Sequence, residues 1–215
     1  ITNLPVEIRS TILEKFAEIL PTKYVLLDWI DKDKLDWQYN LSINPNVIDL
    51  LKERIKYEKS LTDAQFNRLK NKIDWEYLSR NPNAIDLLKI KPDKIHWYAL
   101  SENPNAIDLL KERIEYEKSL TNEELDKLES NINWRYLSSN PNAIKLLNKR
   151  IQFENTLTKE EYNDLDSEDK INWNNLSANP NAIDLLKKNY DKINWNDLSR
   201  NRNAIDLLKK NYDKI

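Results

Sequence analysis

The sequence predicts an all-α protein: an α-solenoid of six helical repeats, preceded by an N-terminal capping helix. One observation behind this prediction is the phrase WEYLSRNPNAIDLL at residues 75–88, of which close copies recur five more times in 215 residues. Another is the Trp that opens each copy, because steps of about 20 to 40 residues are typical of stacked arrays. The last is the absence of Gly, which tight hairpin turns and left-handed helix caps normally use.

The six repeats come in two lengths. Steps of 38, 22, 37, 39 and 22 residues separate the opening Trp residues, so repeats 1, 3 and 4 are long and repeats 2 and 5 are short. The six stand at Trp37, Trp75, Trp97, Trp134, Trp173 and Trp195. A leucine-rich horseshoe has a similar period, but it needs the alternating apolar residues of a strand, and no repeat has them. We expect two helices in a short repeat and three in a long one.

The minimal repeat reads as two short antiparallel helices. Trp75 and Leu78 lie three residues apart, which is the spacing of one face of a first helix. Asn is a strong N-cap and Pro suits the first helical position, so each Asn-Pro pair predicts a second helix that starts at the Pro, as at Pro82. Ala84 and the apolar residues after it form a stripe near helical period, and the small Ala84 permits close approach of a neighbour.

The long repeats insert 15 or more extra residues after the Leu pair, as in KERIEYEKSLTNEELDKLESN after Leu110. The first of these residues continue the helical pattern through Ile114. A capping box of the form Thr-x-x-Glu or Thr-x-x-Gln then predicts a third helix. The boxes are Thr62 with Gln65, Thr121 with Glu124, and Thr158 with Glu161.

The predicted domains are an N-terminal helical cap, residues 1–34, and the repeat solenoid, residues 35–215. One helical stripe would cover the first repeat: Leu4, Ile8, Ile12, Leu13, Phe16 and Leu20. At the other end, Leu207, Leu208 and Ile215 have no following repeat in this sequence. A solenoid must cover its terminal apolar face, so we expect either further residues or end-to-end contact between chains through the C-terminal repeat.

Composition narrows the classes of function. The hydrophobic fraction of 40%, with seven Trp and ten Tyr, is that of a folded chain. A formal net charge of -2 gives no overall cationic field for nucleic acid or an anionic membrane. The absence of Cys excludes disulfides and thiolate chemistry. No window approaches the roughly 18 apolar residues of a membrane span, so neither nucleic acid nor a membrane is expected as a partner.

Several recurring residues invite a catalytic or ligand role, and we interpret them as structural. His96 stands where other repeats place Asp or Asn before the Trp, which predicts a helix boundary rather than catalysis. The recurring Ser predicts a hydrogen bond at a helix end; its copies are Ser42, Ser79, Ser101, Ser138, Ser177 and Ser199. The second Asn of each phrase, from Asn46 to Asn203, is expected to bond to the backbone of the adjacent turn or repeat. The Trp series is expected in the core rather than as a platform for stacked bases.

Some positions of the first helix differ from repeat to repeat, although the Trp, Leu, Ser and Asn positions stay the same. On a helix that turns about 100° per residue, positions one, two and five after each Trp face away from the Trp and Leu side. Variation there is what a modular binding surface requires, and the alternative is ordinary solvated surface. Tyr and Arg give contact area with little loss of entropy. The candidate partner-binding face is Glu76, Tyr77, Arg80, Tyr98, Glu102, Arg135, Tyr136, Asn174, Asn196 and Arg200.

The stretch WNNLSANPNAIDLLKKNYDKINW at residues 173–195 carries nearly every element of a repeat that the chain resembles over residues 26–215. That repeat, W-x-x-L-S-x-N-P-N-A-I-x-L-L followed by a D-K-I link, is abundant in giant DNA viruses of the mimivirus and algal-virus kind. Three departures from it are Val47 for Ala, Lys145 for an acid and Arg202 for Pro. The opening NLPVEI also resembles the start of an F-box, a helical motif that docks substrate adaptors onto ubiquitin ligases.

These observations together predict a non-enzymatic protein-interaction or virion-scaffold module without catalytic residues, metal or cofactor. The viral resemblance implies the host cytoplasm, a viral factory or the virion as its location. One alternative is a helical-repeat protein that reads nucleic acid, although the variable positions carry three Arg and no Lys against three acids. Another is an F-box substrate adaptor.

Overall fold

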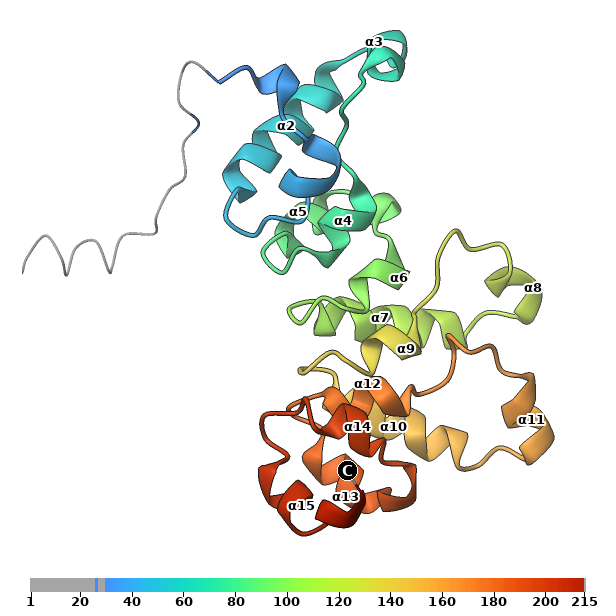
Figure 1. Ribbon diagram of the computed structural model, residues 1–215. Helices are drawn as coiled ribbons and strands as arrows, with labels where there is room; N and C mark the ends of the chain where they lie inside the picture. Colours follow the sequence, from blue (N-terminus) through green and yellow to red (C-terminus); the bar gives the residue numbers. More distant parts are fainter. Residues whose placement is uncertain (1–25, 27–29, 215) are drawn as a thin grey trace, which may run out of the picture. The chain divides into compact units, whose positions relative to one another are not determined.

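The computed structural model describes residue 26 and residues 30–214, and Figure 1 shows their arrangement. All regular secondary structure in these residues is helical and none of them is in a strand, which confirms the all-α class. The chain divides into two parts between Leu35 and Asp36. The described first part holds one short 3-10 helix, η1 (Lys32–Lys34). The predicted capping helix and the F-box-like segment lie outside the described residues.

Each repeat in the second part begins with a short helix at its Trp. These first helices are η2 (Trp37–Leu41), α4 (Trp75–Arg80), α6 (Trp97–Leu100), α9 (Trp134–Leu137), α12 (Trp173–Ala178) and α14 (Trp195–Leu198). The residue before the Trp caps the helix: the Asn133 side chain accepts a hydrogen bond from the Tyr136 N–H at 2.8 Å. His96 does the same through Nδ1, which lies 3.3 Å from the Ala99 nitrogen, so the predicted helix boundary is confirmed.

The first helix of repeat 1 is a π-helix, because this repeat has one residue more than the others between its Trp and its Asn-Pro pair. A π-turn takes up one extra residue, closing i→i+5 hydrogen bonds such as Leu41 N–H to Asp36 O at 3.1 Å. Ser42 Oγ donates to the Trp37 carbonyl at 2.6 Å across five residues, where Ser79 reaches Trp75 across four. The Ser therefore keeps its place relative to the Trp despite the insertion.

The second helices start three residues later than the sequence predicts. They are α2 (Ile48–Ser60), α5 (Ile85–Ile90), α7 (Ile107–Lys118), α10 (Ile144–Glu154), α13 (Ile183–Lys188) and α15 (Ile205–Lys209). The expected start at Pro82 is wrong: Pro82 and Asn83 form a turn closed by the Ala84 N–H and the Asn81 carbonyl at 3.1 Å. The Asn81 side chain accepts from the Asn83 N–H at 3.0 Å, so it stabilises this turn and not a helix end.

The third helices of the long repeats begin at the predicted capping boxes. They are α3 (Asp63–Arg68), α8 (Asn122–Leu125) and α11 (Lys159–Asp164). In repeat 4, Thr158 Oγ1 accepts from the Glu161 N–H at 3.2 Å while the Glu161 carboxylate accepts from the Thr158 N–H at 2.7 Å. The hydrogen bonds that this carboxylate accepts from the backbone and side chain of Thr158 lower the pKa of the exposed Glu161 carboxyl. Short 3-10 helices follow the second helices of the short repeats and of repeat 6: η3 (Pro92–Lys94), η4 (Tyr190–Lys192) and η5 (Tyr212–Lys214).

The core uses the same few positions in every repeat. The Leu three residues after the Trp is fully buried in repeats 2 to 6, as Leu137 is. In repeats 2 to 6 the Ala before the second helix is buried with it, as at Ala143, which agrees with the small residue predicted there. Trp37 and Trp134 lie in the core as expected, while the other repeat Trp residues are half-buried. A wide indole reaches the surface along one edge more readily than Leu does.

Successive repeats are joined by the polar residues of the recurring phrase. Asn140 of repeat 4 is 1% exposed, and its Nδ2 donates to the Ser101 carbonyl at 3.1 Å and to the Asn103 carbonyl at 3.0 Å. Both acceptors belong to repeat 3. The first Asn of the phrase therefore satisfies two backbone carbonyls of the preceding repeat, a role that the sequence interpretation missed.

Two more hydrogen bonds complete each junction. The Asn133 N–H donates to Ser101 Oγ at 3.0 Å, and Asn142 Nδ2 donates to the Pro104 carbonyl at 2.8 Å. We call these four hydrogen bonds and their equivalents the Ser–Asn ladder. It recurs at all five junctions between the six repeats. The predicted backbone bond of the second Asn is thereby confirmed in repeats 2 to 6, although this Asn is exposed. The predicted helix-end bond of the recurring Ser is seen in its donation to the Trp carbonyl, as at Ser138 and Trp134.

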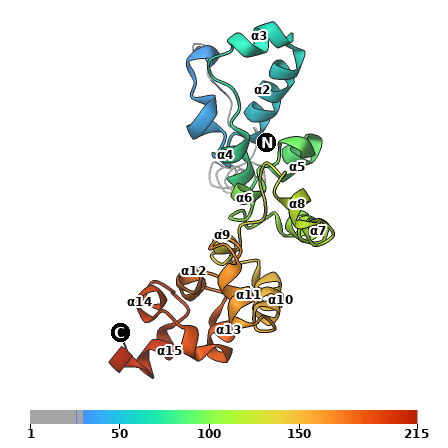
Figure 2. The same ribbon diagram turned by 90° about the vertical axis from the view of Figure 1, so that its right-hand side faces the viewer.

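The Ser–Asn ladder does not involve the inserted segments, so it joins long and short repeats alike. First helices of neighbouring repeats pack together, α4 against α6 and α12 against α14. The same neighbours stay adjacent after a quarter turn of the view (Figure 2). The segments that carry α8 and α11 lie on one side of this part of the chain (Figure 1). Long and short repeats therefore differ in their second and third helices, while the hydrogen bonds that join neighbouring repeats stay the same.

Circular dichroism is expected to show a predominantly helical spectrum with little strand signal. Every repeat carries capped helices and apolar residues at helical spacing, and residues 30–214 contain no strand. A spectrum rich in strand would contradict both the sequence prediction and the fold.

Candidate functional site

An Arg and a Glu four residues apart hold the inserted segment of each long repeat against the second helix. In repeat 3, Arg113 Nε donates to Glu117 Oε1 at 2.7 Å, and Arg113 Nη2 donates to the Ser130 carbonyl at 2.9 Å. Glu117 Oε1 also accepts from the Ile132 N–H at 3.1 Å. The equivalents are Arg54 with Glu58, Asn71 and Ile73, and Arg150 with Glu154, Asp169 and Ile171. We call this arrangement the Arg–Glu clip.

The side chains of the Arg–Glu clip are largely buried, and this burial shifts the pKa values of their carboxyl groups. Burial raises the pKa of the Glu117 and Glu154 carboxyls, against the opposing effect of their Arg partners and backbone donors. Burial likewise raises the pKa of Asp169. The sequence signal was the recurring R-I-x-(Y/F)-E at residues 54–58, 113–117 and 150–154. An Arg–Glu pair at this spacing is usually a solvated helix face, so its long-range role was not predicted.

The Arg of the clip also braces an exposed aromatic ring. The Arg113 guanidinium carbon lies 4.8 Å from the Trp97 ring centroid and 5.2 Å from that of Tyr116. Arg54 and Arg150 hold Tyr57 and Phe153 in the same way. The three rings remain 46%, 48% and 46% exposed for Tyr57, Tyr116 and Phe153. Each long repeat thus presents a large ring to solvent with its position already set by a cation–π contact.

Replacing Arg113 with Met is expected to lower the free energy of unfolding by about 2 kcal/mol at pH 7, because the buried Glu117 carboxylate loses its cation. Loss of Arg113 raises the pKa of Glu117 further above its ordinary value. The ionised carboxylate then disfavours the folded state more, so the deficit grows as pH rises from about 4. Urea unfolding at pH 4 and pH 7 measures this.

The matched control is Lys118→Met on the same helix. Lys118 pairs with Glu115 at 3.0 Å, but both side chains are exposed, so the expected cost is about 0 to 0.5 kcal/mol. A deficit for Arg113→Met that is the same at both pH values would show that Glu117 does not depend on Arg113.

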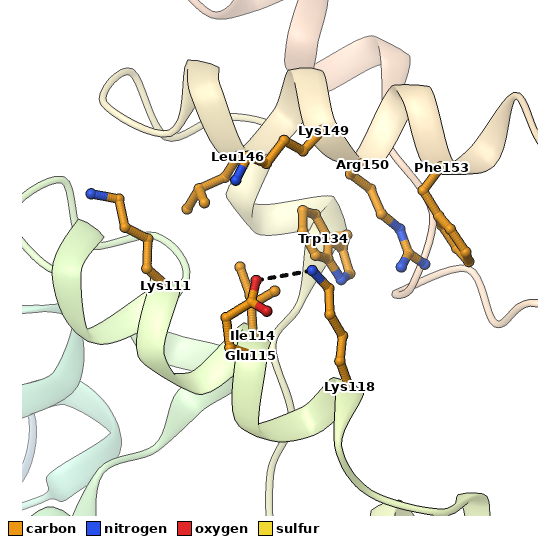
Figure 3. A pocket seen from close by; sticks show the side chains of 9 residues that line it. All are labelled: Lys111, Ile114, Glu115, Lys118, Trp134, Leu146, Lys149, Arg150 and Phe153. Carbon is orange, nitrogen blue, oxygen red and sulfur yellow. Dashed lines mark hydrogen bonds and ion pairs between the residues drawn. The ribbon is translucent and has the colours of Figure 1, made fainter.

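The second helices of repeats 3 and 4 enclose a groove of about 580 Å³. One wall is α7 and the other is α10, and Trp134 of α9 lies between them (Figure 3). We call it the α7–α10 groove; its lining is Lys111, Ile114, Glu115, Lys118, Trp134, Leu146, Lys149, Arg150 and Phe153. Ile114, Trp134 and Leu146 are buried and form an apolar floor. The volume lies in the range of ligand pockets, about 300 to 1,000 Å³.

The rim of the α7–α10 groove is cationic. It carries three exposed Lys side chains and one carboxylate, Glu115, while its fourth cation, Arg150, is already paired with Glu154 in the Arg–Glu clip. Lys111 and Lys118 pair with exposed Asp108 and Glu115, and exposed pairs of this kind are weak and exchange readily with other anions. Lys149 is exposed and has no ion pair among the described residues. The groove therefore combines an apolar floor with cations available to a ligand.

The candidate face predicted from the sequence splits into two groups. Its N-terminal members pack on one another: Tyr98 meets Tyr136 edge-on at a centroid distance of 4.8 Å, and Arg80 binds Glu76 at 2.8 Å and Glu102 at 3.3 Å. Tyr77 contacts Tyr39 of repeat 1 in the same edge-on manner. The exposed members are Arg135, Asn174, Asn196 and Arg200. Partner binding through this face stays a prediction.

Tyr98 illustrates how closely these neighbours interact. Hydrogen bonding with Tyr136, together with burial, raises the pKa of Tyr98 to about 12. The phenol therefore stays protonated at physiological pH and acts as a neutral hydrogen-bonding group. The positions chosen as the free side of the first helices thus also contribute to the contact between repeats.

A second pocket, of about 480 Å³, has the opposite charge. Five acids line it, Glu76, Glu129, Asp166, Glu168 and Asp169, beside His96 and Tyr98. Among residues 30–214, however, no group of His, Asp and Glu is placed to hold a metal ion. The described part of the chain also has no helix long and apolar enough to cross a membrane.

Comparison with protein-family models, with curated proteins and with solved structures found no match for this chain.

Proposed function

We propose that the chain is an α-solenoid of six repeats that acts as a non-enzymatic protein-interaction or virion-scaffold module, of the repeat kind found in giant DNA viruses. The single observation that carries the interaction function is the exposed ring braced by Arg in each long repeat, Tyr57, Tyr116 and Phe153. Large aromatic side chains beside Arg are the residues most enriched at binding hot spots. A ring held in place loses little entropy on binding.

The Ser–Asn ladder supports the solenoid proposal. Because the same four hydrogen bonds join every pair of neighbouring repeats, repeats can be stacked in any order of length. Each repeat then has the same backbone and the same junctions but carries different surface side chains, which is how repeat proteins build extended binding surfaces. The alternative of an F-box adaptor depends on residues outside those described and stays a prediction.

The test uses a variant that removes the three rings, Tyr57→Ser, Tyr116→Ser and Phe153→Ser together. Partners captured by the tagged chain from cells infected with a giant DNA virus of this kind would be identified, purified and rebound to the chain. We expect the triple variant to lose most of the affinity for the purified partner. A double variant at exposed apolar residues of repeats 2 and 6, Ile90→Ser with Ile205→Ser, is the control.

Two outcomes would contradict this function. One is a partner that binds the triple variant as tightly as the natural sequence, since the exposed rings would then carry no binding. The other is RNA or single-stranded DNA that binds more tightly than any protein, with affinity falling steeply as salt rises, as phosphate contacts require. That result would favour the nucleic-acid alternative.

A further inference from the structure

The α7–α10 groove arises from the order of the repeats. Repeats 3 and 4 are the one consecutive pair, among the six, in which both second helices have more than ten residues. Elsewhere in residues 30–214 a long second helix, such as α2, is followed by a six-residue one, such as α5. Among the helices of residues 30–214, only α7 and α10 can therefore offer two long walls side by side.

The two walls present matched helical faces. The lining residues of α7 are 111, 114, 115 and 118, and those of α10 are 146, 149, 150 and 153. Both sets follow the spacing i, i+3, i+4, i+7, which is one face of a helix over two turns, about 10 Å long. A third helix laid between two such faces buries an apolar stripe of the same spacing, as in known helix-in-groove recognition.

The charged residues of the α7–α10 groove indicate what kind of helix would bind there. Lys118 and Lys149 stand on opposite walls, and the buried Ile114 and Leu146 lie between the charged positions (Figure 3). An occupant with Asp or Glu beside its apolar stripe meets these cations, whereas a basic occupant is repelled. We propose that the α7–α10 groove binds an acidic amphipathic helix of a partner protein. This inference rests on the proposed interaction function and adds the chemistry of the ligand.

The experiment measures binding of a labelled 15-residue peptide to the full chain by fluorescence anisotropy. The peptide is designed as a helix, with Leu along one face and Glu on both sides of that face. A second peptide has Lys in place of every Glu. We expect saturable binding of the Glu peptide, weakening as salt rises, and binding of the Lys peptide at least about 10-fold weaker.

The test variant is Lys118→Glu with Lys149→Glu, which reverses a charge on each wall. We expect it to bind the Glu peptide about 10-fold or more weakly and to gain affinity for the Lys peptide. The matched control is Lys59→Glu with Lys188→Glu. Lys59 occupies in α2 the position of Lys118 in α7, Lys188 occupies in α13 that of Lys149 in α10, and both are exposed. The control should bind as the natural sequence does.

Three results would overturn the inference. They are the absence of saturable binding of the Glu peptide up to about 1 mM, equal binding by the test and control variants, and binding of decanoate but not of the peptide. The last would assign the groove to a small anionic amphiphile. Capture of a natural partner that depends on Tyr57 and Tyr116, which do not line the groove, but not on Lys118 and Lys149 would keep the proposed function while removing this groove from it.

Discussion

The substitution Asn140→Asp is expected to lower the free energy of unfolding by about 3 to 5 kcal/mol at pH 7. Asn140 is 1% exposed, and its Nδ2 donates to the Ser101 and Asn103 carbonyls. An ionised Asp has nearly the same shape as Asn, but it places an anionic oxygen against the two carbonyl oxygens. None of these three oxygen atoms can donate a hydrogen bond. The Ser–Asn ladder between repeats 3 and 4 would then lose the two buried hydrogen bonds that the Asn140 side chain donates.

The pH dependence of this loss has a definite sign. A buried carboxyl facing two acceptors has a folded-state pKa raised above its unfolded value of about 3.9, because only the protonated form can donate. The Asn140→Asp variant should therefore be least destabilised below pH 4 and lose stability as pH rises. Urea unfolding across this range measures the effect.

Asn142→Asp is the matched control, two residues along the same phrase. Asn142 also donates to a carbonyl of repeat 3, that of Pro104 at 2.8 Å, but its side chain is exposed. Water can replace that bond, so the expected loss is about 1 kcal/mol or less. Equal losses for the two variants would contradict the assignment of the buried Asn as the main polar joint.

Trp134→Ala should cost about 3 to 5 kcal/mol, as expected for deleting a large core aromatic. Trp134 is 8% exposed, packs under the Arg150 guanidinium at 4.8 Å and forms part of the floor of the α7–α10 groove. Its removal leaves a cavity between α9 and α10 and takes away one surface of the Arg–Glu clip.

Tyr136→Ala, two residues further along α9, should cost much less than Trp134→Ala. Tyr136 is half-buried, and its ring meets Tyr98 edge-on at 4.8 Å, a contact worth about 0.5 to 1.5 kcal/mol beyond area burial. Denaturant melts of both variants compare the two faces of the first helix. Comparable losses would mean that the Trp and Tyr faces contribute equally to the core.

The features predicted well from the sequence are those that depend on neighbours a few residues away. The caps at His96 and Asn133, and the capping boxes of the third helices, each join residues three apart. The start of the second helices was predicted wrongly at the same local level. Asn-Pro is equally compatible with a helix N-terminus and with a turn stabilised by the Asn side chain, and the turn forms here.

The candidate site was less predictable. Positions around the first helices were chosen because they vary and face away from the Trp, but Tyr98 and Arg80 contact other members of the same set in neighbouring repeats. The groove and the braced rings lie on the second helices of the long repeats. Their sequence signal, an Arg–Glu pair with an aromatic residue between, is common on solvated helices and does not by itself indicate a site.

By itself, the sequence determined the helical class, the division into long and short repeats, the caps and most of the core positions, because apolar spacing and capping act within one or two helical turns. Only the tertiary structure decided what the buried Asn residues bind, where the Arg–Glu clips close and which two helices enclose a groove. The ladder bonds of these Asn join residues 22 to 41 positions apart. Contacts between residues so far apart in the sequence form only once successive repeats have stacked. They therefore depend on the geometry of the junction between repeats and not on the local conformational preferences of the chain.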